Sequence, residues 1–278
     1  MALYAFDGTW NEDEEDEARD SNVVRFRDAY QGNLYYLEGV GTRLGFIGKV
    51  LGGVAGAGGK LRIREAIEAL ERNLAAGDRT IDIVGFSRGS ALAVHFANEV
   101  KENFPEVRIR FLGIWDLVAS FGIPGNPINL GWHLTLPDNV EKCCHALALD
   151  ERRENFRPTR IKRADGSVPP RETLREVWFR GVHSDVGGGQ SVGLSHISLC
   201  WMIRQAEAAG LSFDAQKLAG YASRCDATAP ISKNFDPQLD PARRIEATDL
   251  IHHTVSARPD AGRLVHNNPP PGNPIETA

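Results

Sequence analysis

Several features are scarce in this sequence, and each absence narrows the possibilities. Only four of the 278 residues are cysteines and none forms a CxxC pair, so we expect reduced, mostly buried thiols instead of a disulfide framework. No apolar run approaches the roughly 20 residues that a membrane span needs. The formal net charge of −5 provides no overall basic field, which argues against nucleic acid as a partner.

The first residues, MALYAFDGTW, lead directly into a strand-like pattern. They show no basic start, no long apolar region and no cleavage site, all of which a signal peptide would have. We therefore expect a cytoplasmic protein, or one exported by a signal-peptide-independent route.

Short apolar segments alternate with longer amphipathic ones along the chain, which is typical of an α/β fold. Strands are predicted at residues 3–6, 34–37, 80–86, 107–115 and 177–182, and helices at 63–75, 90–103, 140–154 and 197–209. The central strands are apolar nearly throughout, so helices are expected to cover both faces of the sheet. The prediction is a three-layer sandwich with a mostly parallel central sheet, formed by one domain over residues 1–260.

Two other segments are predicted to lack regular structure. The acidic run NEDEEDEARD at 11–20 indicates a solvated loop. From about residue 230 the chain is rich in proline and short polar stretches, and residues 261–278 are expected to form an irregular C-terminal tail with a frayed end.

Residues 81–100, IDIVGFSRGSALAVHFANEV, place a serine between two glycines where a buried strand gives way to a helix. G-x-S-x-G in this setting is the nucleophile elbow. Gly85 and Gly89 let strand and helix approach closely, and the hydroxyl of Ser87 stands above the carboxyl edge of the sheet. The helix N-terminus and the amide of Arg88 can face a developing oxyanion. We predict that Ser87 is a nucleophile; the alternative is a structural turn serine.

A nucleophilic serine needs a base that an acid holds in place. The next strand, in FLGIWDLVAS, ends at Asp116, and the one after it, in VWFRGVHSDVGGG, delivers His183 and Asp185. We expect Asp116 to orient His183 as the base, because Asp185 is too close in sequence to face the imidazole. His252 and His253 follow the last plausible strand and remain alternative bases.

Six blocks of the sequence carry a resemblance to a known family: FDGTWN (6–11), YYLEGVGT (35–42), GFSRGS (85–90), FLGIWDLVAS (111–120), HALALDERRENFRP (145–158) and VWFRGVHSDVGGG (177–189). The blocks occur in this order between residue 1 and about residue 260. With them the chain resembles the DUF2235 family of α/β hydrolases, which is related to Tle1-type phospholipase effectors of type VI secretion. The resemblance implies an α/β-hydrolase-like fold, a triad of Ser87, Asp116 and His183, and hydrolysis of phospholipid esters. Family members commonly have alanine where this chain has Ser90, and larger members carry long insertions that this chain lacks.

Two of these blocks suggest further roles. FDGTWN follows the first strand, where this fold places its second oxyanion donor, so the amide of Gly8 or Thr9 is a candidate and Asp7 would stiffen the loop. In ALDERR, Arg152 or Arg153 either forms a buried salt bridge or faces an anionic substrate.

A glycine-rich segment lies between residues 45 and 59. Its spacing does not fit a phosphate-binding loop, and no clear strand precedes it, so no nucleotide cofactor is expected. Apolar side chains, including Phe46 and Ile47, are interleaved with the glycines. We predict a mobile flap over an acyl pocket; the alternative is a loop packed permanently on the sheet edge.

The leading hypothesis is a serine esterase or lipase that needs no metal or cofactor. One alternative is a metal-dependent hydrolase with Asp7, Asp116, His183 and Asp185 as ligands; the other is a catalytically inactive interaction module. The expected partners are a small-molecule or lipid ester, a membrane contacted transiently and, if the protein is an effector, an immunity or secretion protein.

Overall fold

The computed structural model describes residues 1–8, 19–37, 54–119, 132–153, 156–190, 192–232, 242–258 and 267–277. Its centre is an eight-stranded sheet in the order β2-β1-β3-β4-β5-β6-β7-β8, and all neighbouring strands are parallel. The strands are β1 (Ala2–Phe6), β2 (Asn33–Leu37), β3 (Thr80–Phe86), β4 (Arg108–Trp115), β5 (Val140–Ala148), β6 (Leu174–Phe179), β7 (Leu250–His252) and β8 (Ile275–Glu276). Because all strands run the same way, the segments that follow them meet at one edge of the sheet.

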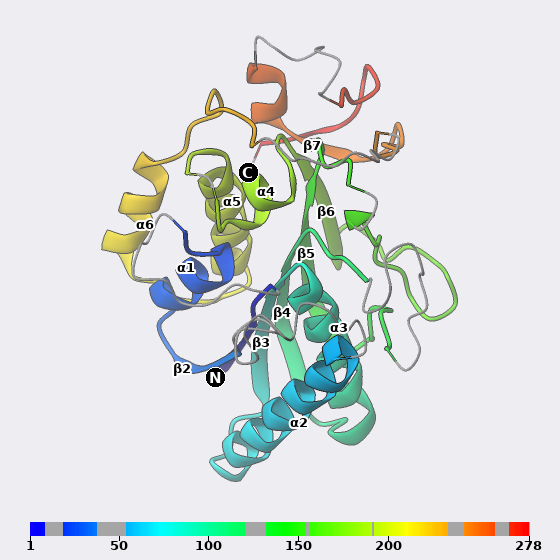
Figure 1. The fold of residues 1–278 in the computed structure, drawn as a ribbon. Coiled ribbons are helices and arrows are strands. Elements are labelled where there is room, and N and C mark those ends of the chain that lie inside the picture. Colours follow the sequence, from blue (N-terminus) through cyan, green and yellow to red (C-terminus); the bar gives the residue numbers. More distant parts are fainter. Residues whose placement is uncertain are drawn as a thin grey trace.

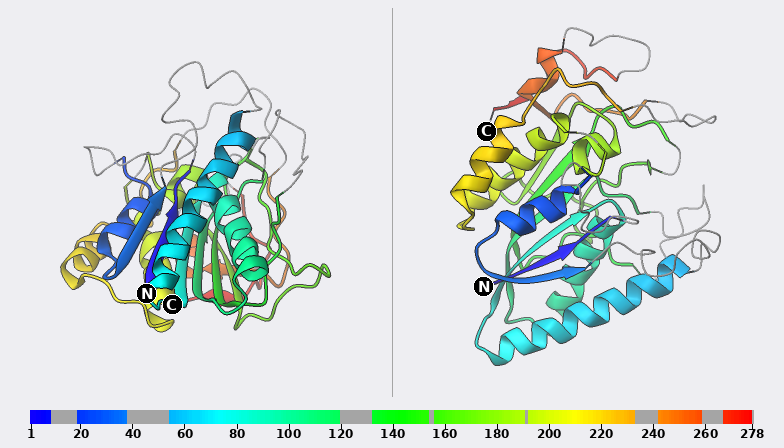
Figure 2. Two further views of the ribbon diagram at one scale, coloured as in Figure 1. Left: turned by 90° about the horizontal axis from the view of Figure 1, so that it is seen from below. Right: turned by 60° about the vertical axis from the view of Figure 1, so that its left-hand side comes forward.

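Helices cover both faces of this sheet (Figure 1 and Figure 2). α2 (Val54–Ala75) and α3 (Arg88–Asn103) pack on one face, while α1 (Asn22–Ala29), α5 (Leu194–Ala208) and α6 (Ala215–Ser223) lie on the other. The predicted three-layer α/β architecture with a parallel sheet is therefore confirmed.

The sequence of β1 shows how both layers are attached to the sheet. Leu3 and Ala5 point towards α1 and α5, whereas Tyr4 and Phe6 point towards α2 and α3. All four side chains are buried. Apolar residues at consecutive positions are what a strand covered on both faces requires.

Two predicted elements differ from the structure. Residues 140–154 were expected to be helical, but their first part is β5, which lies between β4 and β6. Burial within the sheet outweighs the helix propensity of this segment. The strand predicted at 177–182 is β6, which starts earlier and ends at Phe179, so His183 begins the short helix α4 (His183–Gly187).

The end of the glycine-rich segment is helical. Residues 54–59 belong to α2, so the prediction of a flexible loop is wrong for them. A Cβ on Gly59 would collide with the ring of Trp132, which explains one glycine at the start of this helix. Residues 45–53 of the segment, and 11–18 of the acidic run, lie outside the described residues.

The C-terminal region contributes to the sheet, contrary to the expected irregular tail. β7 pairs with β6, and β8 pairs with β7. Glu276 of β8 is buried, and its Oε2 accepts hydrogen bonds of 2.9 and 2.6 Å from Arg175. Residues 267–274 form no helix or strand, as expected, but the predicted fraying is wrong for Ile275 and Glu276, which form β8.

The four cysteines are free thiols. Cys143 and Cys144 lie buried in β5, whereas Cys225 is exposed and its Sγ lies 3.5 Å from that of Cys200. The expected burial thus holds for the adjacent pair and is wrong for Cys225.

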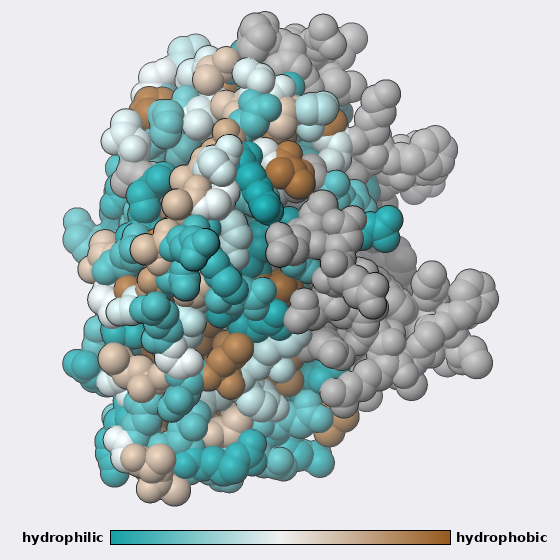
Figure 3. Space-filling view, turned by 90° about the vertical axis from the view of Figure 1, so that its left-hand side faces the viewer, coloured by the Kyte–Doolittle hydropathy of each residue, from teal (hydrophilic) through white to brown (hydrophobic). Residues whose placement is uncertain are grey.

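The face that carries α1 and α6 is mostly hydrophilic, with apolar residues scattered over it (Figure 3). Within the described ranges, no helix combines the length and the apolar character needed to cross a bilayer.

Candidate active site

Ser87 occupies the sharp turn between β3 and α3. Its φ of 59° and ψ of −126° lie in a region that side chains rarely adopt, at a cost of roughly 1–3 kcal/mol. A Cβ on Gly89 would overlap the carbonyl oxygens of Phe6 and Asp7, and one on Gly85 would approach the Gly89 carbonyl within 2.7 Å. Both glycines are therefore required by close backbone contacts. The Ser87 side chain does not cap α3, so the hydroxyl is not used to hold the helix.

Asp116 follows β4 in a similarly unusual conformation, with a φ of 41°. Its amide donates to the Ala146 carbonyl at 2.8 Å, and its Oδ1 accepts from the Ala148 amide at 2.9 Å. Both contacts are to β5, the strand beside β4. The neighbouring strand therefore holds both the backbone and the carboxylate of Asp116.

The carboxylate of Asp116 meets the imidazole of His183 at the sheet edge. Asp116 Oδ2 and His183 Nδ1 are 2.6 Å apart, and both side chains are buried. The His183 ring lies between Phe86, at 4.6 Å between centroids, and Phe156, at 4.8 Å. Phe86 directly precedes Ser87, so the histidine packs against the elbow.

These contacts determine how His183 can act. Burial lowers its pKa below the ordinary value, although Asp116 opposes this shift. A neutral imidazole with its proton on Nδ1, donated to Asp116, leaves Nε2 free to accept a proton. This arrangement is suitable for a general base near neutral pH.

Arg243 completes the surroundings of Asp116 and had not been predicted. Its Nη1 donates to Asp116 Oδ1 at 2.6 Å and its Nη2 to Oδ2 at 3.0 Å. Although burial alone would raise it, the pKa of Asp116 is held well below its usual range by Arg243 and by the bond to His183. No local sequence signal indicates this pairing, because Arg243 comes from a segment that was predicted to be irregular.

His145 is a second residue that sequence reasoning missed. It is fully buried in β5, where it is the register partner of Glu176 on β6. Its Nε2 accepts from the amide of Leu117 at 3.2 Å, and its Nδ1 lies 2.9 Å from Glu176 Oε1. His145 therefore supports the backbone immediately after Asp116. Recognition of 143–149 as a buried strand would have drawn attention to it.

Two of the predicted oxyanion donors, Arg88 and Gly8, lie at the same edge. Arg88 is the first residue of α3, so its amide is one of those that a helix leaves without an internal acceptor. Gly8 follows β1, and its amide donates to Asp7 Oδ1 at 2.6 Å. Asp7 also accepts from Ser21 Oγ at 2.7 Å and from Tyr36 Oη at 3.0 Å, contacts that stiffen this loop. Thr9, like Phe46 and Ile47, lies outside the described residues.

The alternative bases have other surroundings. His252 stacks on Phe179 at 4.6 Å, and its Nδ1 lies 2.8 Å from Thr254 Oγ1. His253 is exposed. The imidazole that contacts Asp116 is that of His183.

The four residues of the metal-site alternative are not gathered around one point; Asp116 and His183 bind each other, while Asp7 and Asp185 have other partners. Asp116 binds His183 and Arg243, whereas Asp185 accepts from the amide and the hydroxyl of Ser232. In the described parts of the chain, no group of three or more His, Cys, Asp or Glu side chains is arranged to hold a metal ion.

The sequence matches a family model described as "T6SS, Phospholipase effector Tle1-like, catalytic domain" over residues 3–102 and 91–205. No curated protein matches it significantly. A crystal structure of an uncharacterized protein from Pseudomonas aeruginosa has the same fold, with a TM-score of 0.60 and 23% identity over 81% of this chain and 48% of the other. A Tle1 effector bound to the VgrG spike of the type VI secretion system shows 24% identity and a TM-score of 0.49, over 68% and 50% of the two chains. This chain thus spans about half the length of these structures. The family match covers most of the sequence, and the chain belongs to the Tle1-like catalytic-domain family of type VI secretion phospholipase effectors.

Proposed function

We propose that this chain is a serine hydrolase that cleaves the carboxylic esters of phospholipids through Ser87, His183 and Asp116. The observation that carries the proposal is the buried 2.6 Å contact between His183 Nδ1 and Asp116 Oδ2. It lies at the sheet edge where the strained turn presents Ser87. Family membership supports phospholipids as the substrate class.

In the proposed reaction, Ser87 Oγ attacks the ester carbonyl carbon while His183 Nε2 accepts the hydroxyl proton. The amide of Arg88 and a donor from the loop after β1 stabilise the negative carbonyl oxygen; this donor is Thr9, or Gly8 once its amide leaves Asp7 Oδ1. When the tetrahedral intermediate collapses, the bond to the alcohol oxygen breaks and His183 returns its proton to the leaving alcohol. Water, activated by the same histidine, then hydrolyses the acyl-Ser87 ester and releases the fatty acid.

A flap formed by the segment around Phe46 and Ile47 belongs to the same proposal. Replacing both residues by serine should slow hydrolysis of long-chain esters much more than that of acetyl esters, because only long chains need an apolar cover. Equal loss on both substrates would contradict the flap.

Export without a signal peptide and brief contact with a membrane are also proposed, on the basis of the family alone. Co-purification with a spike protein of the secretion apparatus, and with an immunity protein, would test the expected partners. Secretion that continues in cells lacking the type VI apparatus would contradict this route.

The central test combines labelling with turnover. A fluorophosphonate should label the wild-type protein at Ser87, and short-chain phospholipids should release fatty acid. Ser87→Ala should abolish both signals and retain the native circular dichroism spectrum, with a loss in rate of roughly a thousandfold or more. A chelator should change neither signal. Turnover by Ser87→Ala would reject the proposed nucleophile, and labelling without turnover of any ester would favour the interaction module.

A further inference from the structure

A cavity of about 310 Å³ lies beside the triad. Its described lining residues are Glu151, Arg152, Arg153, Phe156, Arg157, Pro158, Arg243 and Arg244. Three of them contact the triad directly: Arg243 binds Asp116, the ring of Phe156 packs on that of His183 at 4.8 Å, and Glu151 accepts the His183 amide. The cavity is therefore separated from Asp116 and His183 only by residues that touch them.

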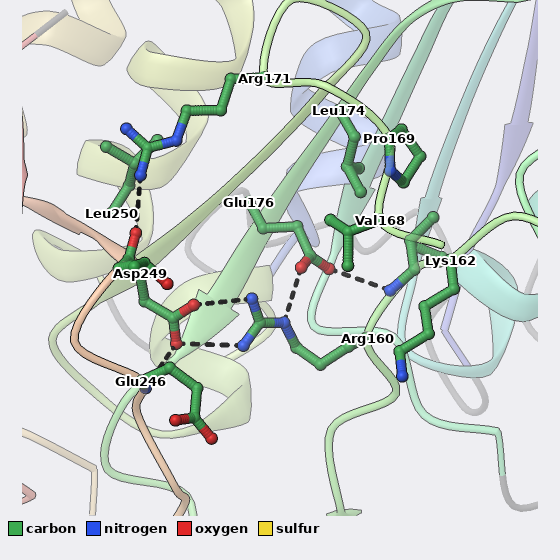
Figure 4. A pocket seen from close by; sticks show the side chains of 12 residues that line it. Arg160, Lys162, Val168, Pro169, Arg171, Leu174, Glu176, Glu246, Asp249 and Leu250 are labelled. Atoms are coloured by element: carbon green, nitrogen blue, oxygen red, sulfur yellow. Dashed lines mark hydrogen bonds and ion pairs between the residues drawn. The ribbon is translucent and has the colours of Figure 1, made fainter. Parts of the chain in front are cut away.

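The described lining of this cavity is strongly basic. Five arginines and a single carboxylate line it. By contrast, a cavity of about 460 Å³ lined in part by β6 contains three basic and three acidic side chains. There, Arg160 binds both Glu176 and Asp249 (Figure 4). Of these two cavities, only the one beside the triad has more basic than acidic side chains in its lining.

Two of the five arginines, Arg153 and Arg243, form part of the cavity wall. Arg153 binds Glu151 at 2.8 Å, and its guanidinium stacks 3.6 Å over the ring of Phe156. Arg243 is buried on Asp116. Glu151 also accepts the amide of His183 at 3.2 Å. The walls are therefore built from the same contacts that position the catalytic histidine and its acid.

The other three arginines have access to solvent. Arg157 and Arg244 are exposed, and Arg152 is half-buried. Arg244 pairs with Glu246 on the surface, and such an exposed ion pair contributes only about 0–1 kcal/mol, so Arg244 can turn to a ligand at little cost. Guanidinium groups bind phosphate oxygens in a bidentate manner.

We propose that this cavity binds the phosphate of the substrate's headgroup, an inference that rests on the proposed ester hydrolysis at Ser87. In a glycerophospholipid, the phosphate and the ester carbonyls are attached to the same three-carbon glycerol, so a phosphate in the cavity would hold an ester near the triad. The volume of about 310 Å³ is at the lower end of the roughly 300–1,000 Å³ of ligand pockets, which suits a headgroup. The acyl chains then lie outside this cavity.

The catalytic test compares two esters that differ only in the phosphate. Dihexanoyl phosphatidic acid carries it, and dihexanoyl glycerol does not. The double variant Arg152→Gln/Arg157→Gln should lower kcat/KM at least about tenfold for the first ester and less than about twofold for the second. Arg171→Gln, the same replacement beside the balanced cavity, should change neither value. Equal losses on both esters, or no loss on either, would overturn the proposal.

A binding test is independent of turnover. Calorimetry with the Ser87→Ala variant should detect glycerol 3-phosphate, and adding the two glutamine substitutions should remove this signal. Binding of inorganic phosphate without binding of glycerol 3-phosphate would assign the cavity to free phosphate and overturn the headgroup role. If the wild-type protein hydrolysed neither ester, the proposed function would fail, whereas calorimetry would still decide whether the anion site exists. If the double variant does not fold, the single variant Arg157→Gln, whose side chain is exposed, replaces it in both tests.

Discussion

Arg243 binds both carboxylate oxygens of Asp116, although 127 positions separate the two residues in the sequence. The distances of 2.6 and 3.0 Å and the burial of both side chains make this a bidentate pair removed from water. Two parallel bonds fix the plane of a carboxylate. Oδ2 is thereby held where His183 can donate to it.

Removal of Arg243 should destabilise the fold as well as the site. Arg243→Met leaves the Asp116 carboxylate buried without its cation, which typically costs about 3–5 kcal/mol in the free energy of unfolding. Arg244→Met is the matched control: that side chain is 86% exposed, and its loss should cost less than about 1 kcal/mol. Urea denaturation measures both. Similar stability of the two variants would show that the pair with Asp116 has little energetic importance.

His145 can be tested by two substitutions that each preserve one of its hydrogen bonds. Glutamine places an oxygen near the position of Nε2 and can still accept from Leu117, whereas asparagine keeps a donor for Glu176 and loses the acceptor. His145→Asn should therefore lower kcat about 10–100-fold by displacing Asp116, with little change in KM, while His145→Gln stays within about threefold of wild type. Steady-state kinetics on a soluble ester provides the measurement. Equal kcat values for the two variants would contradict a positioning role.

His183→Ala should be about as damaging to kcat as Ser87→Ala, because members of a triad act as a unit. Asp116→Asn should cost somewhat less, since a misoriented imidazole still works occasionally. Replacement of the exposed His253 by alanine should have a mild effect. A large loss with His253→Ala and a small one with His183→Ala would reverse the assignment of the base.

Stability should fall as the pH drops below about 6.5, the ordinary histidine pKa. Burial lowers the pKa of His196 to about 4 and that of His252 to about 3, so the unfolded chain binds protons before the folded one does. Their contribution is fully present above pH 6.5 and is lost towards these folded values, by up to about 2 kcal/mol per histidine at pH 5. Urea unfolding at pH 7.5 and pH 5 measures the change. His196→Gln should reduce the loss; an unchanged loss in His196→Gln would contradict this origin.

Two glycine-to-alanine substitutions should have opposite effects. A Cβ at Gly89 would overlap the carbonyl oxygens of Phe6 and Asp7, whereas one at Gly220 in α6 meets nothing within 4 Å. Gly89→Ala should therefore lower the melting temperature and reduce labelling of Ser87. Gly220→Ala should stabilise the protein by about 0.5–1 kcal/mol, as alanine does in a helix. Unchanged stability of Gly89→Ala would show that the elbow can widen.

The parts of the site that sequence reasoning placed correctly in the fold share one property. Ser87, Asp116 and His183 each lie within a few residues of the end of a buried strand. Apolar runs mark such strands, and the parallel arrangement brings their ends to one edge. Local pattern was therefore sufficient to place these three residues, and the structure adds the contact between Asp116 and His183.

The missed residues depend on contacts between distant segments. Arg243 acts on a carboxylate far away in the sequence, from a segment that composition marked as irregular. His145 lies in residues 140–154, for which the sequence predicts a helix; only its pairing with Glu176 across β5 and β6 reveals its role. Strand register and side-chain partners arise from tertiary structure, which local propensity does not encode.

The Arg243–Asp116 pair also has a consequence for synthesis of the protein. Translation delivers Ser87, Asp116 and His183 well before Arg243 leaves the ribosome. Until then the carboxylate of Asp116 has no arginine to balance its charge. The parallel sheet depends on contacts between distant segments, and at that stage it still lacks β7. A nascent chain is therefore unable to complete the contacts of Asp116 at this edge of the sheet. For a protein proposed to attack lipids, this order delays completion of the proposed site until most of the described residues have been made.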